Sequence, residues 1–224
     1  MHTLLKVSAL CASLCVLSGT ATAVPVLDPA GDFLSTLHPD APRAGDLDVL
    51  SAETFLIGET FLFTATMDAP IGTTDLAFYV WGIDRGTGAT TANFASLGLP
   101  DIVFDALLVA QNDGTAAVLL FPDTPGPPGP PMPLAAGSVI NDDSTIHVTV
   151  PLALLPSRGF SADEYGWNLW PRWDGIPFGD DQIADFAPDT TNAPVTVRTV
   201  PEPSTLTLLA LGLAVGGWLR RRRP

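Results

Sequence analysis

Apolar and polar residues alternate along much of the chain between residues 24 and 199. In residues 59–67, Phe61, Phe63, Ala65 and Met67 fall on one side of an extended chain, and mainly threonines fall on the other. Residues 145–150 repeat the alternation with isoleucine and valine. Successive side chains of a strand point to opposite faces, so this pattern predicts antiparallel strands with one face buried and one in water.

Six further segments have the same character, and clusters of Gly, Pro, Asn and Asp separate them: 47–55, 76–83, 102–110, 116–121, 165–170 and 195–199. About eight strands without an amphipathic helix predict an all-β domain, an antiparallel β-sandwich over residues 24–200. We expect one short helical turn at 152–155. The proline-rich segment 124–133 is expected to be a rigid loop inside this single domain, because proline donates no backbone hydrogen bond.

The first residues have the features of a secretory signal peptide. Lys6 precedes a short apolar run, and a small-residue stretch ends in Ala21-Thr22-Ala23, so we expect export through the Sec translocon and cleavage by signal peptidase after Ala23. The alternative is an N-terminal helix that is retained. Both cysteines, Cys11 and Cys15, lie in the leader, and the mature domain therefore has no disulfide, thiolate metal site or cysteine nucleophile.

The net charge of the mature domain limits the classes of molecule that can bind to it. Without Lys6, Glu202 and the four terminal arginines, the ten basic and 24 acidic residues become five arginines and 23 acids, and the formal net charge falls from −14 to about −18. Such a surface repels phosphate backbones and anionic lipid, so nucleic acid is not an expected partner. It favours solubility and divalent cations.

The last residues form three parts in a fixed order. Pro201, Glu202, Pro203 and Ser204 make an extended segment of the shape that a protease groove accepts. An apolar stretch at 205–219 predicts a short transmembrane helix. The four arginines Arg220, Arg221, Arg222 and Arg223 follow it, and the positive-inside rule keeps them in the cytoplasm.

This order of parts, with glycines at 212, 216 and 217, resembles the PEP-CTERM sorting signal. The resemblance implies recognition by an exosortase, a membrane-embedded cysteine transpeptidase or protease of Gram-negative bacteria that make exopolysaccharide. The chain would then be held in the inner membrane transiently, cut near residues 201–203, and left at the cell surface or in the extracellular matrix. The alternative is a permanent single-pass anchor.

The interior also resembles a recurrent ectodomain of bacterial exported proteins, through the segments 28–33, 46–52, 79–86, 167–172 and 185–189. Its strand pattern is similar to sandwich modules of the jelly-roll or DOMON-like type and to family 9 carbohydrate-binding modules. That likeness implies a fold and no established activity.

Two sets of residues are candidates for ligand binding. Calcium takes carboxylate and carbonyl oxygens from loops, and acidic residues near both ends of the domain could converge on such an ion: Asp28, Asp32, Asp46, Asp48, Asp185 and Asp189. Acidic loops that only keep the protein soluble are the alternative.

Trp167, Trp170 and Trp173 are candidates for a glycan-stacking platform, although packing in the core is the favoured explanation for these residues. Arg85 is expected to pair with Asp84, and Arg172 with Asp185 or Asp189.

The sequence therefore predicts a non-enzymatic exported protein with a structural or adhesive role in exopolysaccharide or biofilm. Its three histidines are His2, His38 and His147, and no Gly-x-Ser-x-Gly motif is present, so the sequence offers few candidate residues for hydrolytic catalysis. The alternative is a carbohydrate-binding module, with or without a requirement for calcium, and a glycan-acting enzyme with two carboxylates is a more distant one.

Overall fold

A computed structural model of the chain describes residues 24–86, 92–124 and 126–199. This part of the chain is all-β, with antiparallel sheets and no α-helix. The first sheet has the order β1-β2-β3-β11-β10, and β14 adds to β2 in parallel. Its strands are β1 (Val26–Leu27), β2 (Val49–Ile57), β3 (Thr60–Met67), β10 (Val139–Asp142), β11 (Thr145–Pro151) and β14 (Thr196–Arg198).

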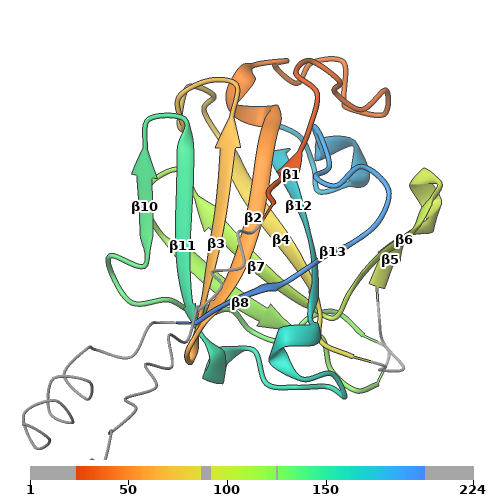
Figure 1. The fold of residues 1–224 in the computed structure, drawn as a ribbon. Helices are drawn as coiled ribbons and strands as arrows, with labels where there is room; N and C mark the ends of the chain where they lie inside the picture. Colours follow the sequence, from red (N-terminus) through yellow and green to blue (C-terminus); the bar gives the residue numbers. More distant parts are fainter. Residues whose placement is uncertain (1–23, 87–91, 125, 200–224) are drawn as a thin grey trace, which may run out of the picture.

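The second sheet has the order β13-β12-β4-β7-β8-β9 and lies behind the first in Figure 1. Its strands are β4 (Ala77–Asp84), β7 (Ala106–Gln111), β8 (Ala116–Leu120), β9 (Met132–Pro133), β12 (Gly166–Trp173) and β13 (Ala193–Pro194). A separate hairpin of β5 (Ala92–Phe94) and β6 (Leu99–Phe104) projects from the body. Five 3-10 turns complete the described part: Gly45–Leu47, Ala95–Leu97, Leu152–Leu154, Ala162–Glu164 and Asp180–Gln182.

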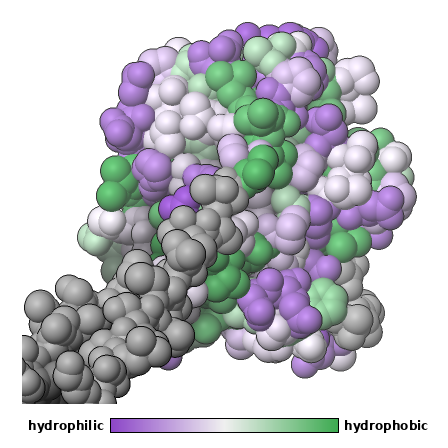
Figure 2. Space-filling model, in the orientation of Figure 1, coloured by the Kyte–Doolittle hydropathy of each residue, from purple (hydrophilic) through white to green (hydrophobic). Residues whose placement is uncertain are grey.

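The two sheets pack face to face around one main core. The alternation in β3 places Phe61 and Phe63 inward, where the ring of Phe61 stacks on Tyr165 and that of Phe63 contacts Trp81. The outer face of the first sheet is partly polar, and hydrophilic and hydrophobic residues are intermixed on the face that Figure 2 shows. The prediction of an all-β antiparallel domain is confirmed, whereas the finer jelly-roll or DOMON-like assignment stays a prediction.

Most predicted strands are present with small shifts at their ends, and the turn expected at 152–155 is the 3-10 turn Leu152–Leu154. The expected strand 102–110 is instead two strands, β6 and β7, which end and begin on either side of Asp105. At this break the buried Asp105 carboxylate accepts a hydrogen bond from Nε of Arg85 at 2.8 Å. A second arginine, Arg158, also reaches this carboxylate, at 3.4 Å.

Both predicted arginine pairs are wrong. Asp84 and Arg85 are neighbours in an extended chain, so their side chains point to opposite sides, and Arg85 reaches Asp105 instead of Asp84. Arg172 donates from Nη2 to the carbonyl of Gly179 at 2.6 Å and to Oε1 of Gln182 at 2.8 Å. The guanidinium therefore organises the loop that follows β12.

The predicted signal peptide, residues 1–23, and the sorting segment from residue 201 on lie outside the described residues, and so does the predicted helix 205–219. Within the described residues, no helix is long and apolar enough to span a membrane.

Packing between sheet and hairpin gives the first testable prediction. Gly82 in β4 lies against the ring of Trp170, and that ring is fixed by Phe94 and Phe104. We expect Gly82→Ala to lower the free energy of unfolding by about 1–3 kcal/mol, because the new methyl group overlaps a ring that cannot move away. Urea unfolding measures the loss. Gly126→Ala is the control, since a methyl group added there would lie 3.8 Å from the nearest side-chain and carbonyl atoms. Equal stability of the two variants would show that the ring of Trp170 does not resist the added methyl group.

Candidate metal centre

Four aspartates from the two ends of the domain meet at one point. Asp28 and Asp32 follow β1, whereas Asp185 and Asp189 lie between the 3-10 turn Asp180–Gln182 and β13. One carboxylate oxygen of each residue lies within 4.8 Å of the corresponding oxygens of the other three. The sequence predicted all four as members of a cation site, and the structure brings these four together.

Backbone hydrogen bonds hold the segment that carries Asp185. Leu169 in β12 and Ala187 exchange two of them, each 2.9 Å long. On the other side, the Leu34 amide donates to the carbonyl of Ala184 at 2.9 Å, and the His38 amide donates to that of Asp181 at 2.9 Å. The segment after β1 and the segment before β13 therefore lie side by side, and this arrangement brings the two pairs of aspartates into contact.

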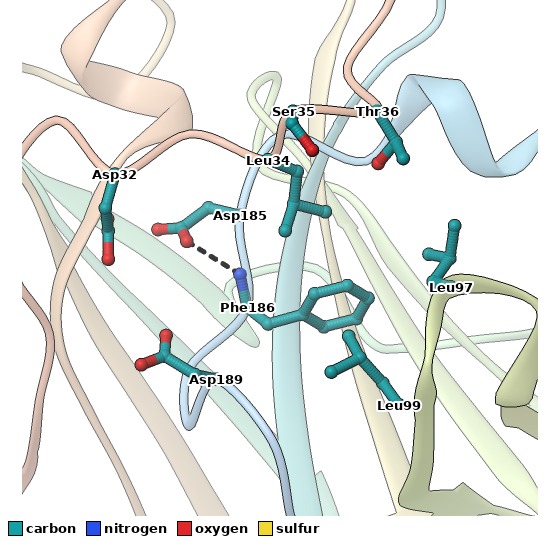
Figure 3. Close-up of a pocket in the computed structure, with 9 residues that line it drawn as sticks. All are labelled: Asp32, Leu34, Ser35, Thr36, Leu97, Leu99, Asp185, Phe186 and Asp189. Carbon is teal, nitrogen blue, oxygen red and sulfur yellow. Dashed lines mark hydrogen bonds between the residues drawn. The ribbon is translucent and has the colours of Figure 1, made fainter.

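The Asp185 side chain is fixed in the cluster. It is 2% exposed, its Oδ2 accepts from the Val49 amide at 2.9 Å, and its Oδ1 accepts from the Phe186 amide at 2.8 Å. Figure 3 shows this carboxylate on the same side of the cavity as those of Asp32 and Asp189. Because both oxygens already accept hydrogen bonds from backbone amides, the Asp185 carboxyl group is held in a fixed orientation at the base of the cluster.

A fifth aspartate borders the cluster. Asp48 is 2% exposed, and its Oδ2 accepts from the Gly31 amide at 2.7 Å, in the turn between Asp28 and Asp32. Its Oδ1 is buried and has no hydrogen-bond partner among the described residues, and the same is true of Oδ2 of Asp28. Asp46, the sixth predicted ligand, is not part of the cluster, because both its oxygens accept from the amide and hydroxyl of Thr74.

The electrostatics of this site are unfavourable as long as it holds carboxylates alone. Burial, and then the negative charges of Asp185 and Asp189, raise the pKa of Asp28 to about 9. Burial also raises the pKa of Asp185 to about 7, although the two backbone amides that it accepts from oppose the shift. The pKa of Asp48 is raised as well, chiefly by burial. None of the ion pairs found among the described residues involves any of the five aspartates.

The cluster opens into a cavity of about 290 Å³. Figure 3 shows its nine lining residues, with the acidic groups on one side and the hydroxyl groups of Ser35 and Thr36 on another. Leu34, Leu97, Leu99 and Phe186 supply the apolar part of the wall. The arrangement suits an ion bound at the acidic side with water, or a small polar molecule, in the cavity beside it.

One residue that supports the site was missed by sequence reasoning. Asn168 is fully buried in β12, and its Nδ2 donates to the carbonyls of Pro188 at 2.6 Å and Thr191 at 2.9 Å. These bonds shape the loop that carries Asp189. A polar residue between two tryptophans in a predicted strand was the available signal, since a buried amide needs partners.

The three tryptophans of the proposed glycan platform do not share one exposed surface. Trp167 and Trp170 are each 2% exposed and belong to different core clusters, one between the sheets and one under the β5–β6 hairpin. Trp173 is half-buried and packs beside a third cluster. A separation of three residues in a strand places side chains on opposite faces, so each pair of neighbours in this set points apart.

The comparisons with known proteins concern the tail. The model of the PEP-CTERM protein-sorting motif matches residues 199–223, which include the predicted cleavage residues 201–204 and the arginines 220–223. The resemblance to this sorting signal is thereby confirmed, and it indicates an exported protein that is anchored transiently and sorted by an exosortase. No curated protein matches the chain.

The raised pKa values predict an unusual dependence of stability on pH. Asp28 and Asp185 have folded-state pKa values of about 9 and about 7, well above the value near 4 of an unfolded chain. The metal-free folded domain therefore holds more protons than the unfolded chain between about pH 4 and pH 9, and its stability falls as the pH rises through that range. Thermal melting in a chelator at several pH values measures this slope. A midpoint that rises from pH 5 to pH 8 would contradict the electrostatic account.

Proposed function

We propose that this chain is a non-enzymatic surface or matrix protein, delivered outside the cell as an acidic β-domain and released from its tail by exosortase. The observation that carries the proposal is the position of the sorting motif, which begins at residue 199, directly after β14 (Thr196–Arg198). With so short a connection, the folded domain stays next to the membrane until the tail is cut. Sec export and signal peptidase cleavage after Ala23 are the matching steps at the other end.

The charge of the domain supports a role in a hydrated polymer matrix. A mature domain with about −18 formal charges repels other copies of itself and anionic lipid, so it disperses after release. A structural role requires a stable fold that survives outside the cell without disulfides. The core between the two sheets provides that stability, with many of its aromatic and aliphatic side chains almost fully buried.

The release step can be tested on the native protein. We expect mass spectrometry of the protein from culture to find a C-terminus near residues 201–203, and to find the full tail only in cells without exosortase. Replacing Pro201, Glu202 and Pro203 with alanine should keep the protein in the membrane fraction. Alanines at Pro130 and Pro131 are the matched control and should leave release unchanged. A native protein that still carries residues 220–223 would show a permanent anchor instead.

Carbohydrate binding is the second candidate, and a groove favours it. A cavity of about 460 Å³ lies between the outer face of the second sheet and the β5–β6 hairpin. Its walls include aromatic residues, and Asn93, Arg172 and Asp180 supply polar groups. Phe178 is 85% exposed beside it, with its ring 4.6 Å from the Arg172 guanidinium. Aromatic faces next to a few polar groups are the usual makeup of a sugar subsite. The candidate surface is therefore this groove, which Trp170 alone of the three tryptophans lines.

If a glycan binds in the groove, removing an aromatic ring that lines it should weaken the binding. If the protein's own exopolysaccharide binds there, Phe178→Ala should weaken binding about threefold to tenfold, because one stacking ring is removed. Ile140→Ala is the control, since Ile140 is also exposed but lies in β10 of the other sheet. Affinity electrophoresis in the polymer measures both. The absence of binding, or equal weakening by both variants, would exclude glycan binding in the groove. The structural role would then be the remaining proposal.

A further inference from the structure

We propose that Asp28, Asp32, Asp185 and Asp189 bind one calcium ion, which ties the first segment of the exported domain to the segment before β13. The proposal assigns a site and a ligand to the acidic cluster and does not depend on exosortase processing or on glycan binding.

The geometry of the cluster fits a calcium ion. Calcium binds oxygens at about 2.3–2.6 Å, so two oxygens on one ion lie at most about 5 Å apart. The four carboxylate oxygens lie within 4.8 Å of one another, which allows all four to contact a single ion. Calcium takes about six to eight oxygens, and second carboxylate oxygens or water in the adjoining cavity can supply the others.

An independent observation points to a missing cation. Asp28 Oδ2 and Asp48 Oδ1 are buried carboxylate oxygens without a hydrogen-bond partner among the described residues. Asp48 is 2% exposed, and its other oxygen accepts from Gly31, next to Asp32. A buried unpartnered carboxylate oxygen costs free energy, and a cation at the cluster supplies the attraction that both lack.

The fixed positions of its carboxylates distinguish this site from a solvated acidic patch. Asp185 is buried and held by two amides, so it cannot turn outward when other carboxylates approach. The negative charges that act on Asp28 and Asp185 come from both segments of the cluster, from Asp32 after β1 and from Asp189 before β13. Asp48, before β2, lies close to Asp32 and Asp68. A solvated patch would spread these groups apart, whereas this fold holds them together.

The location of the site suggests when it is filled. Its ligands come from both ends of the domain, so the site is complete only after the whole domain has folded. Extracellular calcium modules bind with dissociation constants of about 0.1–1 mM, and we expect a value in or below that range. The ion then stabilises the domain after export, in the compartment where calcium is abundant.

The experiment compares calcium with magnesium on the full-length chain in detergent, starting in a chelator. We expect calcium titration to raise the thermal midpoint at pH 8 in a saturable way, with one ion per chain by calorimetry, and magnesium at the same concentration to do much less. An unchanged midpoint without calorimetric binding overturns the proposal, and an equal effect of magnesium overturns the assignment to calcium.

The variants locate the ion. Asp28→Asn should melt higher than the wild type in chelator, because repulsion is removed, and should lose most of the response to calcium. Asp189→Asn should lose the response to calcium as well. Because Asp189 is exposed, this variant provides the test if Asp28→Asn does not fold. Asp142→Asn, an exposed acid in β10, is the control and should keep the full response. A full calcium response in both cluster variants would place the ion elsewhere and refute the site.

Discussion

Electrostatic repulsion among carboxylates is the constraint on how the two ends of this domain meet. The first segment of the domain and the segment before β13 lie side by side through backbone hydrogen bonds such as that from Leu34 to Ala184. The same contact forces Asp28 and Asp32 against Asp185 and Asp189. Repulsion between these carboxylates opposes the closure of the domain at this corner, and protons or a cation would reduce it.

The rest of the fold holds the aspartates in place, so they cannot move apart to relieve their repulsion. Asp185 cannot retreat, because the Val49 and Phe186 amides hold it, and Asn168 fixes the loop of Asp189 from the interior. The second sheet is packed on both faces, by the first sheet on one side and in part by the β5–β6 hairpin on the other. A site that draws its charged groups from such fixed elements is preorganised for a cation. A bound cation would let an exported protein gain stability from the medium that surrounds it.

The sequence predicted the parts of the fold that depend on local pattern. The alternation around Phe61 and Phe63 is sufficient for β3, since the inward side chains repeat every second residue. The break at Asp105 was not predictable, because an isolated aspartate in an apolar run resembles a solvent-facing position. The partner that holds its buried carboxylate, Arg85, lies twenty residues away. Strands of two residues, such as β1 and β13, are too short to show a period at all.

The candidate site could be predicted in composition but not in geometry. Aspartates near both ends of the domain indicated a cation site, yet only the fold separates the four that meet from Asp46, which bonds to Thr74. For the tryptophans, the sequence could not distinguish a core position from a ligand-binding position. Indole rings suit both a core and a sugar platform, and the choice depends on what covers each face of β12, which is tertiary information. The tail was predictable because its signal is read as a linear sequence.

A crystal structure of the protein grown in calcium tests most directly whether a calcium ion joins the two ends of the domain. We predict one anomalous density peak among Asp28, Asp32, Asp185 and Asp189, with oxygens at about 2.3–2.6 Å from it. Carboxylates that are well ordered at this corner in calcium, with no peak among them, would contradict it.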